Sequence, residues 1–356
     1  MGTTLNQTLA AIHPLDEEAM QQAQLRQDEL TKPQGALGRL EALSIQIAGI
    51  TGNSRPKIRD KAIIVMAADH GVVTSGVTLY PQEVTRQMML NFLAGTAGIN
   101  VLARHIGARV VAVDMGILGG FEPHPELISR TIASGTKNMT EGPAMSRQQA
   151  LQAIESGIDV IEGEMRRGID IVGTGDMGIG NTTASAAVCA ALTGKSVSQV
   201  TGRGTGLGEQ QLAHKMSIIE RALKVNQPDP QDPLGVLSKV GGFEIGGLAG
   251  VILGAAANRI PVVIDGFISG AAALIASALC SQATAYMIGG HQSVEIGHRA
   301  IYDHLGIEPL LNLNMRLGEG TGAALAMSIA EAACKILDEM LTFAEADVSS
   351  AEKEVQ

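Results

Sequence analysis

Short apolar runs alternate with longer helical patterns along most of this 356-residue chain. The runs are continuously apolar, as strands covered on both faces of a parallel sheet are. They predict strands over 61–68, 109–113, 169–172, 260–264 and 285–288. The stretches between them predict helices near 83–106, 146–167, 182–193, 208–225, 244–257, 268–281 and 293–304. This alternation is typical of an α/β fold, a doubly wound and mostly parallel sheet with helices on both faces.

The two ends of the chain differ from its middle. Residues 1–60 are polar, rich in Gln and helical, with a break at Lys32-Pro33-Gln34-Gly35. A further helix is predicted at about 322–343. We therefore expect a Rossmann-like catalytic domain over 61–321, and a smaller helical lobe built from 1–60 together with 322–356.

Composition narrows the classes of function. The formal net charge is −10, aromatic residues make up 2%, and no Lys/Arg cluster is present, so nucleic-acid binding is not expected. The cysteines, Cys189, Cys280 and Cys334, lie far apart and indicate a reducing compartment. The N-terminus lacks the pattern of a signal peptide, and the longest uncharged run, from Gly266 to the mid-280s, is interrupted by polar residues. We expect a cytoplasmic protein with small-molecule partners and no membrane span.

Acids, histidines and glycines gather where the predicted strands end. Asp69 and His70 follow the first strand, Asp114 the second and Asp265 the fourth, and His291 comes soon after the fifth. The carboxyl ends of parallel strands meet at one edge of a sheet, where ligands bind. These positions therefore predict a functional rim. The histidines have no compact metal-ligand spacing, so we expect no metal.

A glycine-rich turn follows the third strand. Gly173-Thr-Gly175-Asp-Met-Gly178 matches the GxGxxG dinucleotide pattern and precedes a helix, but the region 192–201 lacks the acid that holds the ribose. The helix start Gly180-Asn181-Thr182-Thr183 suits a single phosphate, and a second turn over 202–208 adds backbone N–H groups and a cation. Packing glycines, an NAD-dependent dehydrogenase and a non-catalytic nucleotide-binding protein remain alternatives.

The segment Arg316-Leu317-Gly318-Glu319-Gly320 places a carboxylate between two glycines, immediately before the last predicted helix. Glycines leave the carboxylate unshielded, and the helix start supplies free N–H groups. This arrangement favours a general base facing a bound small molecule. An exposed glutamate in a tight turn is the alternative.

Several short motifs follow one another through the chain: Lys32-Pro33-x-Gly35, Ala68-Asp69-His70-Gly71, Tyr80-Pro81-Gln82-Glu83, Gly175-Asp176-Met177-Gly178, Gly241-Gly242-Phe243-Glu244, Asp265-Gly266-Phe267, His291-x-Ser293-x-Glu295 and Arg316-Leu317-Gly318-Glu319-Gly320. In this order they resemble the nicotinate-nucleotide:dimethylbenzimidazole phosphoribosyltransferases, which assemble the lower-ligand nucleotide of cobalamin. The resemblance implies transfer of the phosphoribosyl group of nicotinate mononucleotide to 5,6-dimethylbenzimidazole. The products would be α-ribazole 5′-phosphate and nicotinate, with inversion at C1′ and no cofactor.

The resemblance also implies roles for individual residues. The catalytic glutamate of the family falls on Glu319, and two further catalytic positions fall on Asp176 and Lys215; some members carry Glu where this chain has Asp176. Family members form homodimers. Phosphate-binding positions fall on Gly175, Gly178, Asn181, Gly202 and Arg203, the benzimidazole slot falls on Tyr80, Pro81, Gln87 and Leu317, and further substrate-binding positions are Asp265, His291 and Ser293.

Overall fold

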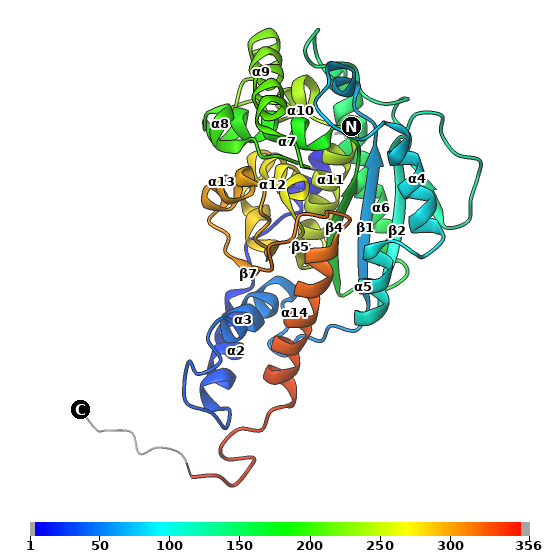
Figure 1. Ribbon diagram of the computed structural model, residues 1–356. Helices are drawn as coiled ribbons and strands as arrows, with labels where there is room; N and C mark the ends of the chain where they lie inside the picture. The colour runs from blue at the N-terminus through cyan, green and yellow to red at the C-terminus, as the bar shows by residue number, and fades with distance from the viewer. Residues whose placement is uncertain (1–3, 205, 350–356) are drawn as a thin grey trace.

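A computed structural model describes residues 4–204 and 206–349 (Figure 1). Its centre is a seven-stranded sheet in the order β3-β2-β1-β4-β5-β6-β7, in which neighbouring strands pair in parallel. The strands are β1 (Lys61–Ala68), β2 (Ala108–Gly116), β3 (Leu127–Ser129), β4 (Ile171–Met177), β5 (Val262–Ile264), β6 (Met287–His291) and β7 (Pro309–Leu311). The strand order reverses between β1 and β4, so the topological switch point lies there.

Helices cover both faces of the sheet, which confirms the predicted fold class. They are α1 (Thr4–Ala10), α2 (Glu17–Glu29), α3 (Arg39–Thr51), α4 (Glu83–Leu93), α5 (Gly98–Ile106), α6 (Arg147–Met165), α7 (Asn181–Thr193), α8 (Val197–Val200), α9 (Glu209–Asn226), α10 (Pro233–Val240), α11 (Phe243–Ala257), α12 (Phe267–Leu279), α13 (Ile296–Leu305) and α14 (Thr321–Glu339). The strand β1 is buried along its whole length. Its Ile64 and Met66 join one core with α6, α7, α11 and α12, whereas Ile63 and Val65 join a second core with α5 and α14.

Glycines allow α6 and α11 to pack with their backbones in contact. A Cβ atom at Gly250 of α11 would overlap the carbonyl oxygen of Ile154 in α6, and one at Gly157 of α6 would overlap that of Gly247. The main chain itself therefore fills the space that side chains normally occupy between helices. This packing explains how a chain with 43 glycines and 2% aromatic residues still builds a dense core.

Two differences from the predicted element boundaries affect the rim of the sheet. The single helix predicted over 83–106 is two helices, because Gly95 has a φ of 72° and the chain turns before α5 begins. Asn100 secures this break: its side chain accepts the N–H of Ala97 and donates to the carbonyl of Phe92. The strand β4 runs on to Met177, so the predicted turn 173–178 is mostly strand. The short elements β3, β7, α8 and α10 were not predicted.

The helices α2, α3 and the C-terminal part of α14 form an extension from the sheet domain (Figure 1). Arg26 of α2 donates to the carbonyl of Leu337 in α14, and Lys32 forms a buried ion pair with Glu41 of α3. The helix α1 was expected in this lobe but packs against α6 and α11 of the sheet domain. Since α14 begins at the sheet and ends in the lobe, it crosses the boundary predicted at 321/322. Residues 350–356, assigned to the lobe, lie outside the described residues.

Within the described part of the chain, no helix has both the length and the apolar character needed to cross a membrane.

Replacing Gly250 with Ala is expected to lower the free energy of unfolding by about 1–3 kcal/mol, because the added methyl group must push α6 away from α11. The matched control is Gly163→Ala on α6, where a Cβ would meet only the flexible guanidinium of Arg166 at 3.8 Å. That control should be neutral or stabilising by up to about 1 kcal/mol, since Ala favours helix. Urea unfolding of both variants measures the difference; equal stabilities would contradict the packing argument.

Candidate active site

Glu319 lies at the rim of the sheet, in the loop that leads into α14. Its side chain is 5% exposed, and its Oε2 accepts the backbone N–H of Ile99 at 3.0 Å, in the first turn of α5. Burial raises the pKa of the Glu319 carboxyl, while the N–H groups of Ile99 and Gly98 partly oppose the rise. A buried carboxyl with a raised pKa and few partners suits proton transfer. The break between α4 and α5, missed in the sequence, is what delivers these N–H groups.

Asp176 lies next to this loop at the end of β4. The N–H of Glu319 donates to the carbonyl of Asp176 at 3.3 Å, and the amide of Asn181 donates to its Oδ2 at 3.0 Å. Its Oδ1 is buried and has no hydrogen-bond partner among the described residues. Burial, and then the nearby charges of Asp265, Glu244 and Glu319, hold the pKa of Asp176 well above its usual value, against the Asn181 hydrogen bond.

The glycines of β4 serve close packing. A Cβ at Gly175 would lie 2.5 Å from the carbonyl oxygen of Glu319, and one at Gly173 would lie 3.0–3.1 Å from Met327 and Ala323 in α14. In the dinucleotide fold such glycines form a turn around a pyrophosphate after the strand. Here both lie inside the strand, beneath α14. The fingerprint reading is therefore wrong, and the dehydrogenase alternative loses its basis.

A buried ion pair between His70 and Glu244 lies near Asp176. His70 and Glu244 are both almost fully buried, with Nε2 and Oε1 2.7 Å apart. Burial lowers the pKa of His70, but the Glu244 charge and hydrogen bond, together with the charge of Asp69, raise it above its usual value. A Cβ at Gly178 would lie 2.5 Å from the carbonyl oxygen of Ala68 and 3.4 Å from the His70 ring. The sequence showed both residues in motifs but gave no sign that they pair.

Lys215 is 1% exposed and connects α9 to α7. Its Nζ donates to Thr182 Oγ1 at 2.8 Å, in the first turn of α7. Burial lowers the pKa of Lys215 to about 8, and the charge of Glu295 opposes that fall. Burial raises the pKa of Glu295, against the effects of Lys215, the Gly204 N–H and Arg316. Glu295 was not among the predicted site residues. A Cβ atom on Gly202 would overlap its Oε2.

A cavity of about 400 Å³ opens beside this cluster. The residues that line it include Gly202, Arg203, Gly204, Glu295 and Arg316. The guanidinium of Arg203 donates to the carbonyl of Leu207. Two arginines and a glycine turn make this cavity attractive to an anion.

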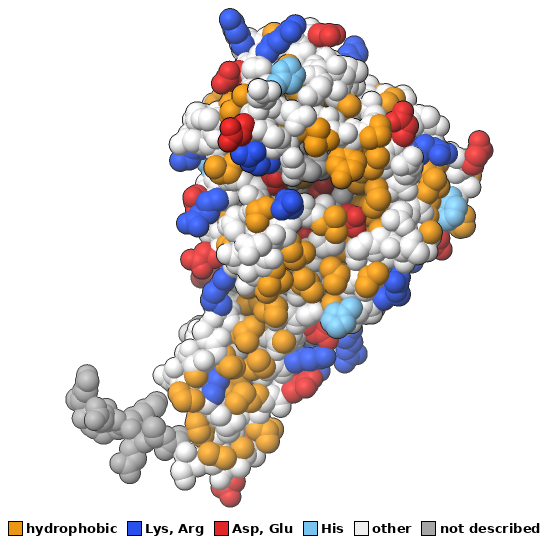
Figure 2. Space-filling view, viewed as in Figure 1, with side chains coloured by type: hydrophobic (Ala, Val, Ile, Leu, Met, Phe, Trp, Pro, Cys, Tyr) orange, Lys and Arg blue, Asp and Glu red, His pale blue; other side chains and the backbone are white. Residues whose placement is uncertain are grey.

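The four residues expected to line the benzimidazole slot are all exposed and come from two segments. Tyr80, Pro81 and Gln87 belong to the entry and first turns of α4, and Leu317 precedes the Glu319 loop. The α4 segment reaches the site, because Thr85 accepts the N–H of Ile179 at 3.0 Å. Leu317 lies over the start of α5, 3.0 Å from where a Cβ on Gly98 would be. Figure 2 shows a hollow on this face, with apolar side chains around acidic ones.

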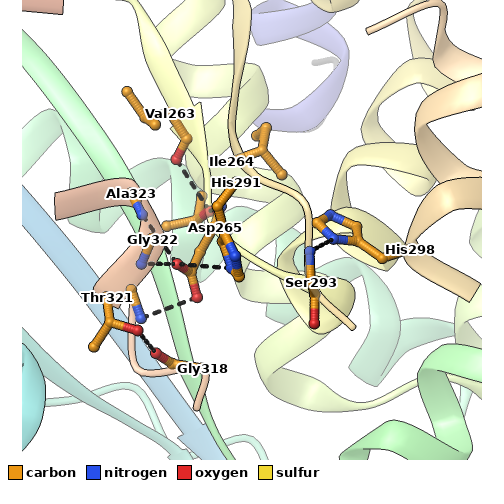
Figure 3. A network of polar contacts seen from close by, with 12 residues as sticks. Val263, Ile264, Asp265, His291, Ser293, His298, Gly318, Thr321, Gly322 and Ala323 are labelled. Atoms are coloured by element: carbon orange, nitrogen blue, oxygen red, sulfur yellow. Dashed lines mark hydrogen bonds and ion pairs between the residues drawn. The ribbon is translucent and has the colours of Figure 1, made fainter. Parts of the chain in front are cut away.

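Asp265, His291 and Ser293 occupy positions inside the protein (Figure 3). Asp265 is fully buried and accepts backbone N–H groups of the α14 start. The ring of His291 packs against Gly322, and Ser293 accepts the N–H of Glu295 at 3.3 Å before α13. Asp265 thus holds a helix start instead of facing open space. Among the described residues, no group of three His, Cys, Asp or Glu side chains could hold a metal ion.

The chain matches a family described as phosphoribosyltransferase over residues 12–348. It is 63% identical over 345 residues to the nicotinate-nucleotide–dimethylbenzimidazole phosphoribosyltransferase of Roseiflexus sp. (strain RS-1), covering 97% of this chain and 98% of that protein. Identity to the protein of the same name from Dehalococcoides mccartyi (strain CBDB1) is 56%, with the same coverage. The crystal structure of CobT from Thermus thermophilus matches with a TM-score of 0.91 and 44% identity, over 94% of this chain and 100% of that one.

Asp176→Asn should stabilise the protein at pH 8 and have progressively less effect towards pH 4. The pKa of this carboxyl is higher in the folded protein than the usual 3.8, so its ionisation costs stability as the pH rises above 3.8, until the raised pKa is passed. An amide of the same shape removes that cost and still accepts from Asn181. Thermal melts across this pH range measure the effect. Asp303→Asn, at an exposed site, is the control, and a lower melting temperature for Asp176→Asn at pH 8 would refute the argument.

Proposed function

This chain belongs to the nicotinate-nucleotide–dimethylbenzimidazole phosphoribosyltransferase family, and we propose that it uses Glu319 as the general base of that reaction. The phosphoribosyl group of nicotinate mononucleotide passes to 5,6-dimethylbenzimidazole, giving α-ribazole 5′-phosphate and nicotinate. The observation that carries the proposal is the setting of Glu319. Its carboxyl is buried at the rim, has a raised pKa, and is oriented by the first turn of α5.

The demands of this reaction fit a site with few reactive groups. One C1′–N bond breaks as nicotinate leaves, and one C1′–N bond forms to the benzimidazole. The departing ring is a pyridinium in the donor, so it leaves with the bonding electron pair as a neutral ring and needs no acid. The attacking benzimidazole gains positive charge, which makes its second ring nitrogen acidic. Glu319 accepts that proton and later releases it to solvent.

Asp176 is proposed to act on the sugar. The transition state carries positive charge near C1′, and a carboxylate close by stabilises such charge. The cluster of Asp176, Asp265 and Glu244 keeps this region of the rim electronegative even though burial raises the pKa of Asp176. A developing positive charge favours ionised Asp176, so its stabilising effect is larger in the transition state than in the resting protein.

Lys215 and the second glycine turn are proposed to hold the phosphate. Lys215 is anchored on Thr182 at the start of α7, and the adjacent cavity is lined by Arg203 and Arg316. A helix N-terminus together with cations favours a phosphate monoester. Gly178 lies in the turn between β4 and α7, Asn181 begins α7, and both are proposed to contact the phosphate. Tyr80, Pro81, Gln87 and Leu317 are proposed to hold the planar acceptor. The homodimer and the cytoplasmic location stay predictions.

Glu319→Gln should lower kcat by about 10²–10⁴-fold, because the amide cannot accept the proton from the acceptor. The KM for nicotinate mononucleotide should change little, since the phosphate and ribose contacts remain. Chromatographic detection of nicotinate and α-ribazole 5′-phosphate measures both constants. Glu308→Gln, at an exposed surface position, is the matched control. An unchanged kcat in Glu319→Gln would remove Glu319 from the mechanism.

The KM for nicotinate mononucleotide should rise as the pH increases from 7 to 9. Lys215 has a pKa of about 8, so it loses its positive charge over this range and attracts the phosphate less. Lys215→Gln should show a high KM that no longer depends on pH in this range. Lys224→Gln, on the exposed face of the same helix, should follow the native protein. A steep pH dependence that persists in Lys215→Gln would place the phosphate elsewhere.

A further inference from the structure

Glu319 has a backbone conformation that side chains rarely adopt. Its φ is 63°, between Gly318 at 81° and Gly320 at 93°, so three consecutive residues lie in the left-handed region. For a residue with a Cβ this conformation costs about 1–2 kcal/mol. Such strain persists only where the surroundings fix the chain. The contacts that fix it therefore decide where the carboxylate of Glu319 points.

Asp265 provides the contacts on one side of the loop. Its Oδ2 accepts the N–H of Gly320 at 3.2 Å, and its Oδ1 accepts those of Gly322 at 2.6 Å and Ala323 at 3.0 Å. These N–H groups belong to the buried start of α14 (Figure 3). Gly320 is the N-cap residue and has no side chain for this task. A carboxylate from the end of β5, more than 50 residues earlier in sequence, thus replaces the usual local cap.

The strand β4 provides the contacts on the other side. The N–H of Glu319 donates to the carbonyl of Asp176, and a Cβ at Gly175 would lie 2.5 Å from the Glu319 carbonyl oxygen. The loop therefore lies between the Asp265 carboxylate and the backbone of β4. The carboxylate of Glu319 then extends to the N–H of Ile99. Among the described residues, no hydrogen bond joins the side chain of Glu319 to the side chain of Asp265.

We infer that Asp265 is a positioning residue for the base, because its carboxylate holds the backbone of Glu319 in the left-handed conformation that aims the base at the acceptor. The inference rests on the proposed function of Glu319. It replaces the expectation that Asp265 contacts the substrate, since Asp265 is fully buried and its oxygens are occupied. A negative side chain at a helix N-terminus is also favoured by the helix dipole, which secures the contact.

The test is Asp265→Asn. The amide oxygen can still accept from Gly322 and Ala323, but the amide nitrogen takes the place of Oδ2 and cannot accept from Gly320. The loop should relax, and kcat should fall by about 10²-fold because the base is misplaced. The KM for nicotinate mononucleotide should stay within about twofold, since no contact to this substrate is lost. A raised KM with an unchanged kcat would assign Asp265 to substrate binding and overturn the inference.

Asp114→Asn is the matched control. Asp114 is a buried aspartate at the end of β2 that accepts the N–H groups of Gly116 and Ile117, both at 2.9 Å. Its Oδ2 accepts the hydroxyl of Thr131 at 3.1 Å, so Asp114→Asn also loses one acceptor, and it should lose some stability while keeping kcat. An equal fall in kcat for Asp114→Asn would mean that the effect reflects stability alone and would overturn the inference. If Asp265→Asn does not fold, Asp265→Ser gives the same comparison, because its hydroxyl still caps the helix without the second acceptor.

A double variant separates this inference from the proposed function. If Asp265 acts through the base, Asp265→Asn should not lower the residual kcat of Glu319→Gln any further, because the group being positioned is already disabled. A further fall as large as in the native background would show that Asp265 acts independently, and would overturn the positioning role while leaving the base intact. A native kcat in the single variant Glu319→Gln would contradict both the general-base role of Glu319 and the positioning role of Asp265.

Discussion

The direct backbone contact between β4 and residues 318–320 is the constraint on which the site depends. Gly175 has no side chain, so the carbonyl of Glu319 can lie against the strand. This contact sets the position of the loop, the loop sets the direction of Glu319, and α14 begins at its end. Gly173 and Gly175, the first two glycines of the pattern that resembles a dinucleotide-binding turn, are thus explained by packing. They allow β4 to lie in close contact with this loop and with α14.

Buried acids surround this contact, and burying their carboxyl groups has an energetic cost. Asp176, Asp265 and Glu319 all have raised pKa values, each with burial as the largest cause. Uncompensated carboxylates are normally excluded from protein interiors. Backbone N–H groups from two helix starts, α5 and α14, satisfy two of the three. The site therefore uses helix termini where many enzymes use basic side chains or metal ions.

The sequence alone was sufficient to predict the features of the fold and of the candidate site that depend on local pattern. Continuous apolar runs predicted β1 and the parallel sheet, and Gly318-Glu319-Gly320 marked the candidate base. Features that depend on contacts between distant segments could not be read locally. The capping of α14 by Asp265 links strand β5 to a loop far away in sequence, and the break before α5 depends on Asn100 reaching back to Phe92. The placement of α1 likewise depends on a partner surface, since Leu5 joins a core that α6 and α11 provide.

The helix α14 belongs to both halves of the molecule. With 19 residues at 1.5 Å per residue it is about 28 Å long. Its Met327, Ala330 and Ala333 share a core with β1, and the helix also packs against α2 and α3. Because its first residue directly follows the strained loop 318–320, one continuous helix connects that loop to the lobe. The packing of the lobe and the position of the Glu319 side chain therefore depend on the same structural element.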